Sequence, residues 1–294
     1  MANLSCDSTS AHALVSEGIM ASFQLALASN DFLNQRYASL GIANLTTTPE
    51  VQAEVIGEGC VPTLVDLFMG KVGDLECQRY ATIAMANLAV LHSNHELLEG
   101  IHHCVSVFAK YLDHPDRELR NSSALALANM SANPACHRAI LDTGCVSKLL
   151  PFLAANTEDK MLQLHAMSVF RGLTVSEASR SEVLGAELIV PVLHLLGTDV
   201  PSIRLEALMC LCNLALTGFI ADYADLVLQH ISIEEIMACL RSSESARRLF
   251  GALAIGNLAF HGERHSLLLE AGALEALTEI YERADDETAR CVAL

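Results

Sequence analysis

Amide side chains recur along this sequence at a spacing that could build a binding site. Asparagine stands near the end of five similar segments, at Asn44, Asn87, Asn129, Asn213 and Asn257. A carboxamide supplies both a hydrogen-bond donor and an acceptor, so a ladder of them can hold the main chain of an extended peptide whatever its side chains. The alternative is that each asparagine caps its own helix or binds the following turn.

The ladder is interrupted in the fourth of six segments, where Arg171 and Gly172 stand in place of the usual residues. A guanidinium group can bind a carboxylate through two parallel hydrogen bonds. Arg171 therefore predicts either an acid-binding position or a solvated arginine paired with a neighbouring glutamate.

Arginine recurs eight or nine residues before the asparagine position, where the helices that end at these asparagines are expected to begin. A cation at a helix N-terminus is disfavoured by the helix dipole, so the recurrence needs a partner. Either each arginine pairs with an acid in the preceding turn, for which Glu76 and Glu118 are placed, or the arginines form a basic line at the edge of a groove and favour an acidic ligand. The arginines are Arg36, Arg79, Arg120, Arg204 and Arg248.

Patterns for catalysis or metal binding are weak. No glycine-rich phosphate loop, nucleophile elbow or zincin helix occurs. His261 and His265 lack the glutamate that follows the first histidine of a zincin, and Cys210 and Cys212 point to different sides of a helix. We expect no catalytic residue, no metal site and no cofactor. One denser group of side chains could hold zinc, but its irregular spacing disfavours a zinc site: His92, His95, His102, His103 and Cys104.

The recurring residues belong to an internal repeat. Six segments end alike, from QRYASLGIANL (35–45) to RLFGALAIGNL (248–258). Their asparagine positions are 44, 87, 129, 172, 213 and 257, so successive steps are 43, 42, 43, 41 and 44 residues. Each unit predicts a short helix, a glycine turn, a middle helix and a longer third helix. The turn glycines are Gly18, Gly59, Gly100, Gly144, Gly185 and Gly272.

The third helix should bury one stripe of side chains, because positions four apart lie on one helical face. Small residues stand six places before the asparagine position: Ala38, Ala81, Ser123, Ala166, Ala207 and Gly251. Larger apolar residues stand two places before it: Ile42, Met85, Leu127, Phe170, Leu211 and Ile255.

This pattern resembles the armadillo repeat of beta-catenin, importin-alpha and related adaptors, over essentially the whole chain from about residue 11. The resemblance implies an all-α, right-handed solenoid with three helices per repeat of about 42 residues. The third helices would line a concave groove that grips a peptide through the asparagine positions. HEAT repeats are the nearest alternative, but the glycine and the Asn-Leu ending favour armadillo.

The chain departs from the importin-alpha pattern, which has tryptophan four residues before the asparagine. Here that place holds Leu40, Ile83, Leu125, Ser168, Met209 and Leu253, and the chain has no tryptophan. Binding of classical nuclear-import signals is therefore disfavoured.

We expect a short tail at 1–10 and a single armadillo domain at 11–294. Its repeats would span 11–48, 49–91, 92–132, 133–175, 176–217, 218–260 and a truncated 261–294. TARCVAL (288–294) enters the third-helix pattern and then stops. A solenoid end normally carries a polar cap, so we expect a longer array, a covering partner or pairing of two copies through this end.

Composition bounds the function. A formal charge of −17 disfavours nucleic acid and anionic membranes as partners. The ten cysteines lie mostly in Leu/Ala-rich helical windows and indicate free thiols in a reducing compartment. The sequence predicts a cytoplasmic scaffold or adaptor, not an enzyme, that binds an extended, acidic protein segment in its groove. The alternative is a structural array of cytoskeletal or axonemal type that docks through its convex face or its ends.

Overall fold

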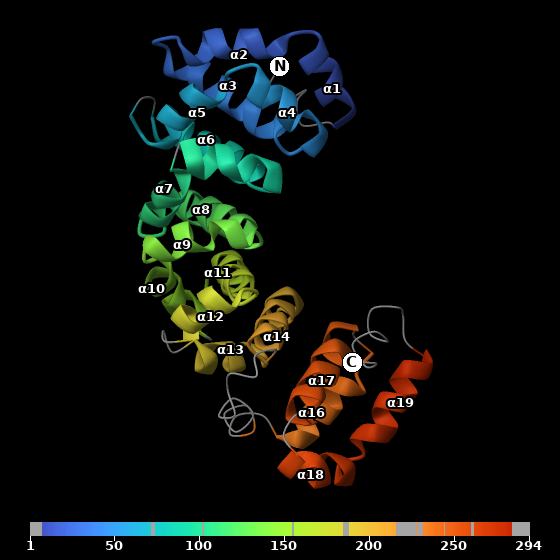
Figure 1. Cartoon of the computed structure of the whole chain (residues 1–294). Helices are drawn as coiled ribbons and strands as arrows, with labels where there is room; N and C mark the ends of the chain where they lie inside the picture. The colour runs from blue at the N-terminus through green and yellow to red at the C-terminus, as the bar shows by residue number, and fades with distance from the viewer. Residues whose placement is uncertain are drawn as a thin grey trace. The chain divides into compact units, whose positions relative to one another are not determined.

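The structure of the 294-residue chain is a computed structural model, and it describes residues 8–71, 74–101, 103–154, 156–184, 188–215, 228, 232–243, 245–259 and 262–283. Within these ranges every regular element is helical (Figure 1). The chain forms two compact units, residues 1–149 and 150–294. The expectation of a single domain at 11–294 stays a prediction.

The first unit repeats a group of helices that ends in a long third helix. In the first two repeats these helices are α1 (Ser8–Ser16), α2 (Ile19–Leu27), α3 (Phe32–Leu45), α4 (Pro49–Gly57), α5 (Val61–Phe68) and α6 (Leu75–Leu88). Next come η2 (His92–Asn94), the π-helical η3 (Glu96–Ile101), α7 (Cys104–Tyr111) and α8 (Arg117–Ser131). The unit closes with η4 (Pro134–Cys136), α9 (His137–Asp142) and α10 (Cys145–Leu149). The third helices stack, α3 on α6 and α6 on α8.

The second unit has the same plan. It contains η5 (Leu150–Leu153), α11 (Lys160–Leu173), α12 (Glu177–Leu184), α13 (Ile189–Leu195) and α14 (Pro201–Ala215). After residues outside the described ranges come α16 (Ile233–Leu240), α17 (Ser245–Ala259), η6 (Gly262–Arg264), α18 (His265–Glu270) and α19 (Ala273–Arg283). Here α11 packs on α14 and α14 on α17.

Aspartate starts four of the third helices. Its side chain accepts a hydrogen bond from a main-chain N–H of the first turn, at 2.9 Å for Asp31, 3.0 Å for Asp74 and Asp116, and 3.2 Å for Asp159. Such a carboxylate satisfies an N–H that the helix leaves without a partner and also complements the helix dipole.

The expected glycine turns are confirmed where the chain must reverse between the first and second helices. Gly18, Gly59, Gly144 and Gly272 have φ between 68° and 79°, which side chains other than glycine rarely adopt. Gly100 does not have this role, because it lies inside η3 and the left-handed residue there is His103, at φ 50°. Gly185 lies outside the described residues.

The buried stripe is confirmed. All six small residues and all six larger apolar residues of the third helices are buried. Gly251 shows why the small position is restricted: a Cβ atom built there would lie 2.6 Å from the main-chain N of Leu240. Helices α16 and α17 therefore pack backbone against backbone at this point.

In the described part of the chain, no helix is long and apolar enough to cross a lipid bilayer. Cys6, His102, His261 and the final TARCVAL lie outside the described residues, as do the side chains of Cys212 and Asn257.

Candidate binding face of the third helices

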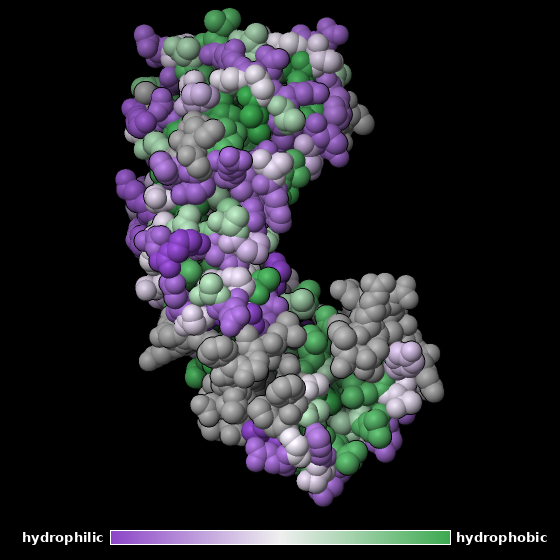
Figure 2. All heavy atoms as spheres, viewed as in Figure 1, coloured by the Kyte–Doolittle hydropathy of each residue, from purple (hydrophilic) through white to green (hydrophobic). Residues whose placement is uncertain are grey.

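In each unit, one face of the third helices combines the asparagine positions with an aliphatic column. We call it the third-helix face. The aliphatic column lies four residues before the asparagine position, with Leu40, Ile83 and Leu125 in the first unit and Met209 and Leu253 in the second; Ser168 interrupts it, and all six residues are half-buried. Tyr37, one turn earlier, is 62% exposed. Figure 2 shows hydrophobic surface in the part of the chain that α2 to α6 form.

Asn44, Asn87, Asn129 and Asn213 are half-buried, and the amide groups of the last three join neighbouring repeats. Asn87 Nδ2 donates to Ala43 O at 3.0 Å and to Thr46 Oγ1 at 3.2 Å. Asn129 Nδ2 donates to Ala86 O at 3.3 Å. Neither asparagine caps its own helix: each holds the third helix of the preceding repeat.

Asn213 follows the same rule, because its Nδ2 donates to Arg171 O at 3.0 Å and to Thr174 Oγ1 at 3.3 Å. Among the described residues, no hydrogen bond reaches the Oδ1 atoms of Asn87, Asn129 or Asn213. The donor half of each amide is thus used inside the array, and the acceptor half is left for a ligand N–H.

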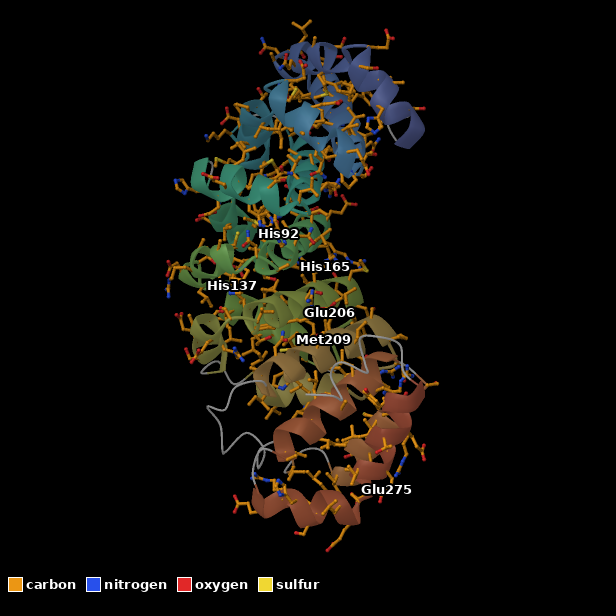
Figure 3. All side chains as sticks on the ribbon, turned by 45° about the vertical axis from the view of Figure 1, so that its right-hand side comes forward. His92, His137, His165, Glu206, Met209 and Glu275 are labelled. Carbon is orange, nitrogen blue, oxygen red and sulfur yellow. The ribbon has the colours of Figure 1, made fainter. Side chains whose placement is uncertain are left out.

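The interruption of the ladder is filled by an ion pair. Arg171 Nε on α11 donates to Glu206 Oε2 on α14 at 2.5 Å. Their side chains are 33% and 20% exposed, and Gly172 is buried. Figure 3 shows Glu206 and Met209 on the same helix, one turn apart. The pairing of Arg171 with a neighbouring glutamate is therefore the alternative that the structure shows.

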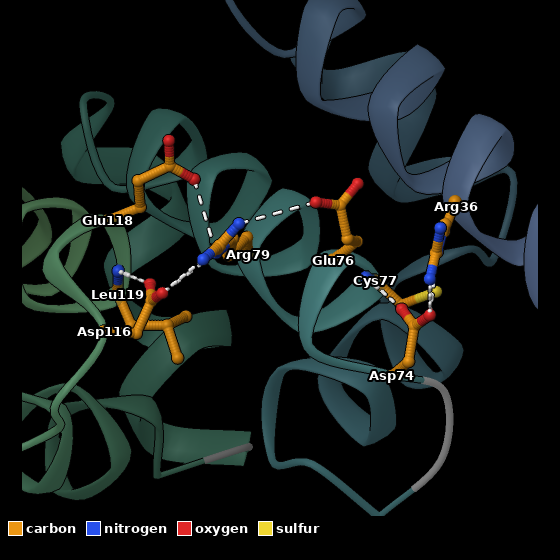
Figure 4. A network of polar contacts seen from close by, with 8 residues as sticks. All are labelled: Arg36, Asp74, Glu76, Cys77, Arg79, Asp116, Glu118 and Leu119. Atoms are coloured by element: carbon orange, nitrogen blue, oxygen red, sulfur yellow. Dashed lines mark hydrogen bonds and ion pairs between the residues drawn. The ribbon is translucent and has the colours of Figure 1, made fainter.

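The five arginines split into two registers with different partners. Arg36 and Arg79 stand eight residues before the asparagine and reach the aspartate that starts the next third helix (Figure 4). Arg36 Nε lies 2.7 Å from Asp74 Oδ2, and Arg79 Nε lies 3.1 Å from Asp116 Oδ2.

Each pair joins two repeats and also changes the acidity of its aspartate. The hydrogen bond from Arg36 lowers the pKa of Asp74 to about 2, and the hydrogen bond from Arg79 lowers the pKa of Asp116. Arg79 also lies 3.4 Å from Glu76 and 3.5 Å from Glu118.

The other three arginines stand nine residues before the asparagine position and bind main-chain carbonyls of the loop before their helix. Arg120 Nη1 donates to His114 O at 2.7 Å, Arg204 Nη1 to Thr198 O at 3.3 Å and Arg248 Nη1 to Ser243 O at 2.7 Å. Gln35 and Gln163 have the same place and also donate to loop carbonyls. Adjacent helix positions point about 100° apart, which explains the two sets of partners.

The arginine line is therefore internal. Glu76 is a partner as expected, but the stronger contacts are to Asp74 and Asp116, which the sequence analysis did not single out. Their own recurrence, at positions 31, 74, 116 and 159, was the signal that could have found them. The expectation of an acidic ligand rested on a free basic line, and the arginines do not supply one.

Among the described histidines and cysteines considered for chemistry, burial distinguishes His95, Cys104 and Cys210 from His103. His95 is buried and its Nε2 lies 2.8 Å from Ala89 O, while His103 is exposed. Burial raises the pKa of the Cys104 thiol, and that of the Cys210 thiol, to about 12. Within the described ranges, no group of three or more His, Cys, Asp and Glu side chains could hold a metal ion.

Comparison with known proteins adds sequence relatives. No protein-family model matches the chain. Rap1 GTPase-GDP dissociation stimulators 1-A and 1-B of Xenopus laevis are each 26% identical over 178 residues, which cover 57% of this chain and 29% of theirs. The chain thus spans less than a third of the length of the curated relatives it matches.

Solved structures show the fold. An engineered protein has a TM-score of 0.84 at 24% identity, and the match covers 99% of this chain and 71% of the engineered protein. A designed armadillo repeat protein in complex with the peptide (KR)4 has a TM-score of 0.69 at 17% identity and covers 82% and 99%. The chain therefore has the armadillo-repeat fold that its sequence predicted.

Proposed function

We propose that this chain is a protein-binding scaffold, without catalysis of its own, that holds an extended segment of a partner protein along the third-helix face. The observation that carries the proposal is the row of half-buried asparagine acceptors beside an aliphatic column, repeated at Ile83 and Asn87 and again at Leu125 and Asn129.

The asparagines would recognise the main chain of the segment. Their Nδ2 groups hold the preceding repeat, so each fixed amide directs its Oδ1 without a further loss of side-chain freedom on binding. Each oxygen can accept one N–H from the partner. Such contacts are independent of the partner's sequence and suit an extended, disordered segment.

The aliphatic column would supply the apolar contacts. Leu40, Ile83 and Leu125 are half-buried in successive repeats and present apolar surface at the repeat spacing of about 10 Å. An extended chain advances about 3.3 Å per residue, so every third residue or so would meet the column. Apolar residues at that spacing are the expected signature of the bound segment.

The charge of the segment is the part of the sequence-based expectation that we revise. An acidic segment would need free cations, and the five arginines are engaged within the array. A protein of charge −17 repels an acidic partner at long range. We therefore propose a neutral or basic segment, which agrees with the basic peptide bound by the designed armadillo protein of the same fold.

Peptide display tests this proposal directly. A library of extended segments is selected on the wild-type chain, and the affinity of a selected peptide is measured for Ile83→Gln/Leu125→Gln. Loss of two apolar contacts of about 1 kcal/mol each should weaken binding about thirtyfold. Leu25→Ser is the matched control, because Leu25 is an apolar residue 76% exposed on the second helix α2. Equal affinity for all three proteins would exclude the third-helix face and favour docking through another surface.

The sequence match favours a second candidate function, binding of a GTPase. It rests on the 178 residues that align with the Rap1 GTPase-GDP dissociation stimulators at 26% identity. The test is release of a fluorescent GDP analogue from Rap1 GTPase with and without this chain. Accelerated release would support the candidate, and an unchanged rate together with no complex by sedimentation would contradict it.

A further inference from the structure

The second unit contains a cavity away from the aliphatic column and the asparagines. It has a volume of about 370 Å³ and lies between the end of α13, the start of α14, and helices α16 and α17. Leu193, Leu208 and Phe250 form buried apolar walls, and Cys239 and Arg204 are half-buried at its edge. Its volume falls within the range of about 300–1,000 Å³ seen for ligand pockets.

The equivalent space in the first unit is filled by a tyrosine. Tyr111 on α7 is buried, its hydroxyl donates to Phe68 O at the end of α5, and Gln78 Nε2 on α6 donates to the same hydroxyl. The Tyr111 ring meets the Phe68 ring edge-on, with centroids 5.6 Å apart. A buried tyrosine with both an apolar and a polar partner is a stable arrangement.

The repeat places the two sites in the same register. Tyr111 stands 18 residues before Asn129, and Cys239 stands 18 residues before Asn257. Gln78 stands nine residues before Asn87, and Arg204 nine before Asn213. The second unit therefore has a small side chain where the first has an aromatic ring, and a guanidinium donor where the first has an amide donor. The cavity is the space that this exchange leaves open.

The cavity is also lined by a cation, Arg247, for which the described residues supply no partner. Arg247 lines it, and among the described residues no hydrogen bond or ion pair to the Arg247 guanidinium is found, its Nε being buried without an acceptor. Arg204 Nη1 donates to Thr198 O at 3.3 Å, and Glu235 accepts from Ser232 N at 2.8 Å. An occupant with an apolar ring and an acceptor oxygen at its tip would suit both the walls and the arginines.

We propose that this cavity binds a tyrosine side chain presented by a partner protein, in the position that Tyr111 occupies within the chain itself. The ring packs against Leu208 and Phe250, and the phenol oxygen accepts from an arginine. The lining of this site includes no member of the aliphatic column and none of the asparagines, so the proposal goes beyond the binding along the third-helix face and does not depend on it.

The first experiment uses the unaltered chain and small probes. Cys239 is half-buried at the cavity, whereas Cys60, Cys104 and Cys145 are buried. The rate at which iodoacetamide alkylates Cys239 is measured by peptide mass spectrometry. Saturating 4-methylphenol should lower this rate at least about threefold, and saturating N-acetyl-tyrosinamide should lower it by the same factor. N-acetyl-phenylalaninamide should bind about tenfold more weakly because it lacks the hydrogen-bonding oxygen.

Two variants at one position give the matched control, read by ligand-observed NMR. Cys239→Tyr carries the side chain that Tyr111 has in the equivalent place and should abolish binding of 4-methylphenol. Cys239→Ser keeps the cavity open and should bind it as wild type does. Circular dichroism at 222 nm checks that both variants are folded. If Cys239→Tyr does not fold, the alkylation experiment on the wild-type chain decides the question.

Three results would overturn the proposal. If no probe slows alkylation of Cys239, the cavity is not a ligand site. Protection by 4-methylphenol but not by N-acetyl-tyrosinamide would show a site for free phenols and not for a protein side chain. Equal binding of the tyrosine and phenylalanine amides would show that the arginines do not recognise the oxygen.

Discussion

Asp74 performs two separable tasks with its two oxygens. Oδ1 accepts from Cys77 N at 3.0 Å and so caps α6, while Oδ2 lies 2.7 Å from Arg36 Nε of the preceding repeat. Asp74→Asn keeps a capping oxygen but loses the charge, because asparagine caps a helix about as well as aspartate. Asp74→Ala loses both. The two substitutions therefore separate the cap from the link between repeats.

The magnitudes follow from exposure. The Arg36 and Asp74 side chains are 36% and 24% exposed, so solvent screening limits their pairing to about 0.5–1 kcal/mol. Loss of a capping side chain costs about 1 kcal/mol. Asp74→Asn should cost about 0.5–1 kcal/mol and Asp74→Ala about 1.5–2 kcal/mol. The matched control is Asp66→Asn, whose pair with Lys71 is about half exposed and should contribute less than about 0.5 kcal/mol.

Hydrogen exchange measured by mass spectrometry suits a repeat protein, because repeat arrays need not unfold in one step. Exchange in the peptides of α6 should rise about threefold in Asp74→Asn and more than tenfold in Asp74→Ala. In 1 M NaCl, where charges are screened beyond about 3 Å, the gap between wild type and Asp74→Asn should shrink and the gap between the two variants should remain. Equal exchange in both variants at low salt would refute the separation of cap and pair.

Further predictions concern pH, packing and thiols. The lowered pKa values of Asp74 and Asp116 mean that both carboxylates stabilise the fold above their unfolded pKa of about 3.9. This contribution should be lost as the pH falls from about 4 towards 2, which an acid titration followed by circular dichroism would measure. Asp74→Asn should make the loss of stability over this pH range smaller. In urea unfolding, Gly251→Ala should lower stability by about 1–3 kcal/mol, because the new Cβ would meet the backbone of α16. Gly256→Ala is the control in the same helix: its Cβ would meet nothing within 4 Å, so stability should stay unchanged or rise by up to about 1 kcal/mol. Cys104, buried and with its pKa raised to about 12, should stay unmodified by iodoacetamide at pH 8 until urea unfolds the chain, and rapid labelling in the native state would contradict its burial.

The repeat made most of the fold predictable. Spacing, turn glycines and the buried stripe depend on local geometry that recurs in every unit, so they could be read from positions such as Gly59, Ala81 and Met85. Gly100 was the exception: the sequence there keeps the glycine, but the chain forms a π-helical turn and places His103 in the left-handed region.

The candidate site was less predictable because its contacts cross between repeats. The direction in which Asn87 donates, to Ala43 O of the preceding third helix, depends on how two repeats stack. The two arginine registers differ by one residue, a shift that looks small in sequence but turns the side chain to a different partner on a helix. The cavity in the second unit was also not predictable, because its likeness to the space that Tyr111 fills in the first unit depends on how the helices pack.

The central claim is that the asparagine oxygens of the third-helix face hold the main chain of a partner segment. It is tested most directly by the affinity of one selected peptide for two double variants, Asn87→Ala/Asn129→Ala and Asn87→Asp/Asn129→Asp, measured by fluorescence polarisation. Both variants lose the Nδ2 contacts between repeats, but only the first loses the acceptor oxygens. With about 0.5–1.5 kcal/mol per hydrogen bond, the alanine variant should bind about 5- to 150-fold more weakly, while the aspartate variant, which keeps the acceptors but loses the contacts that orient them, should bind more tightly than the alanine variant. Wild-type affinity in the alanine variant would contradict the account.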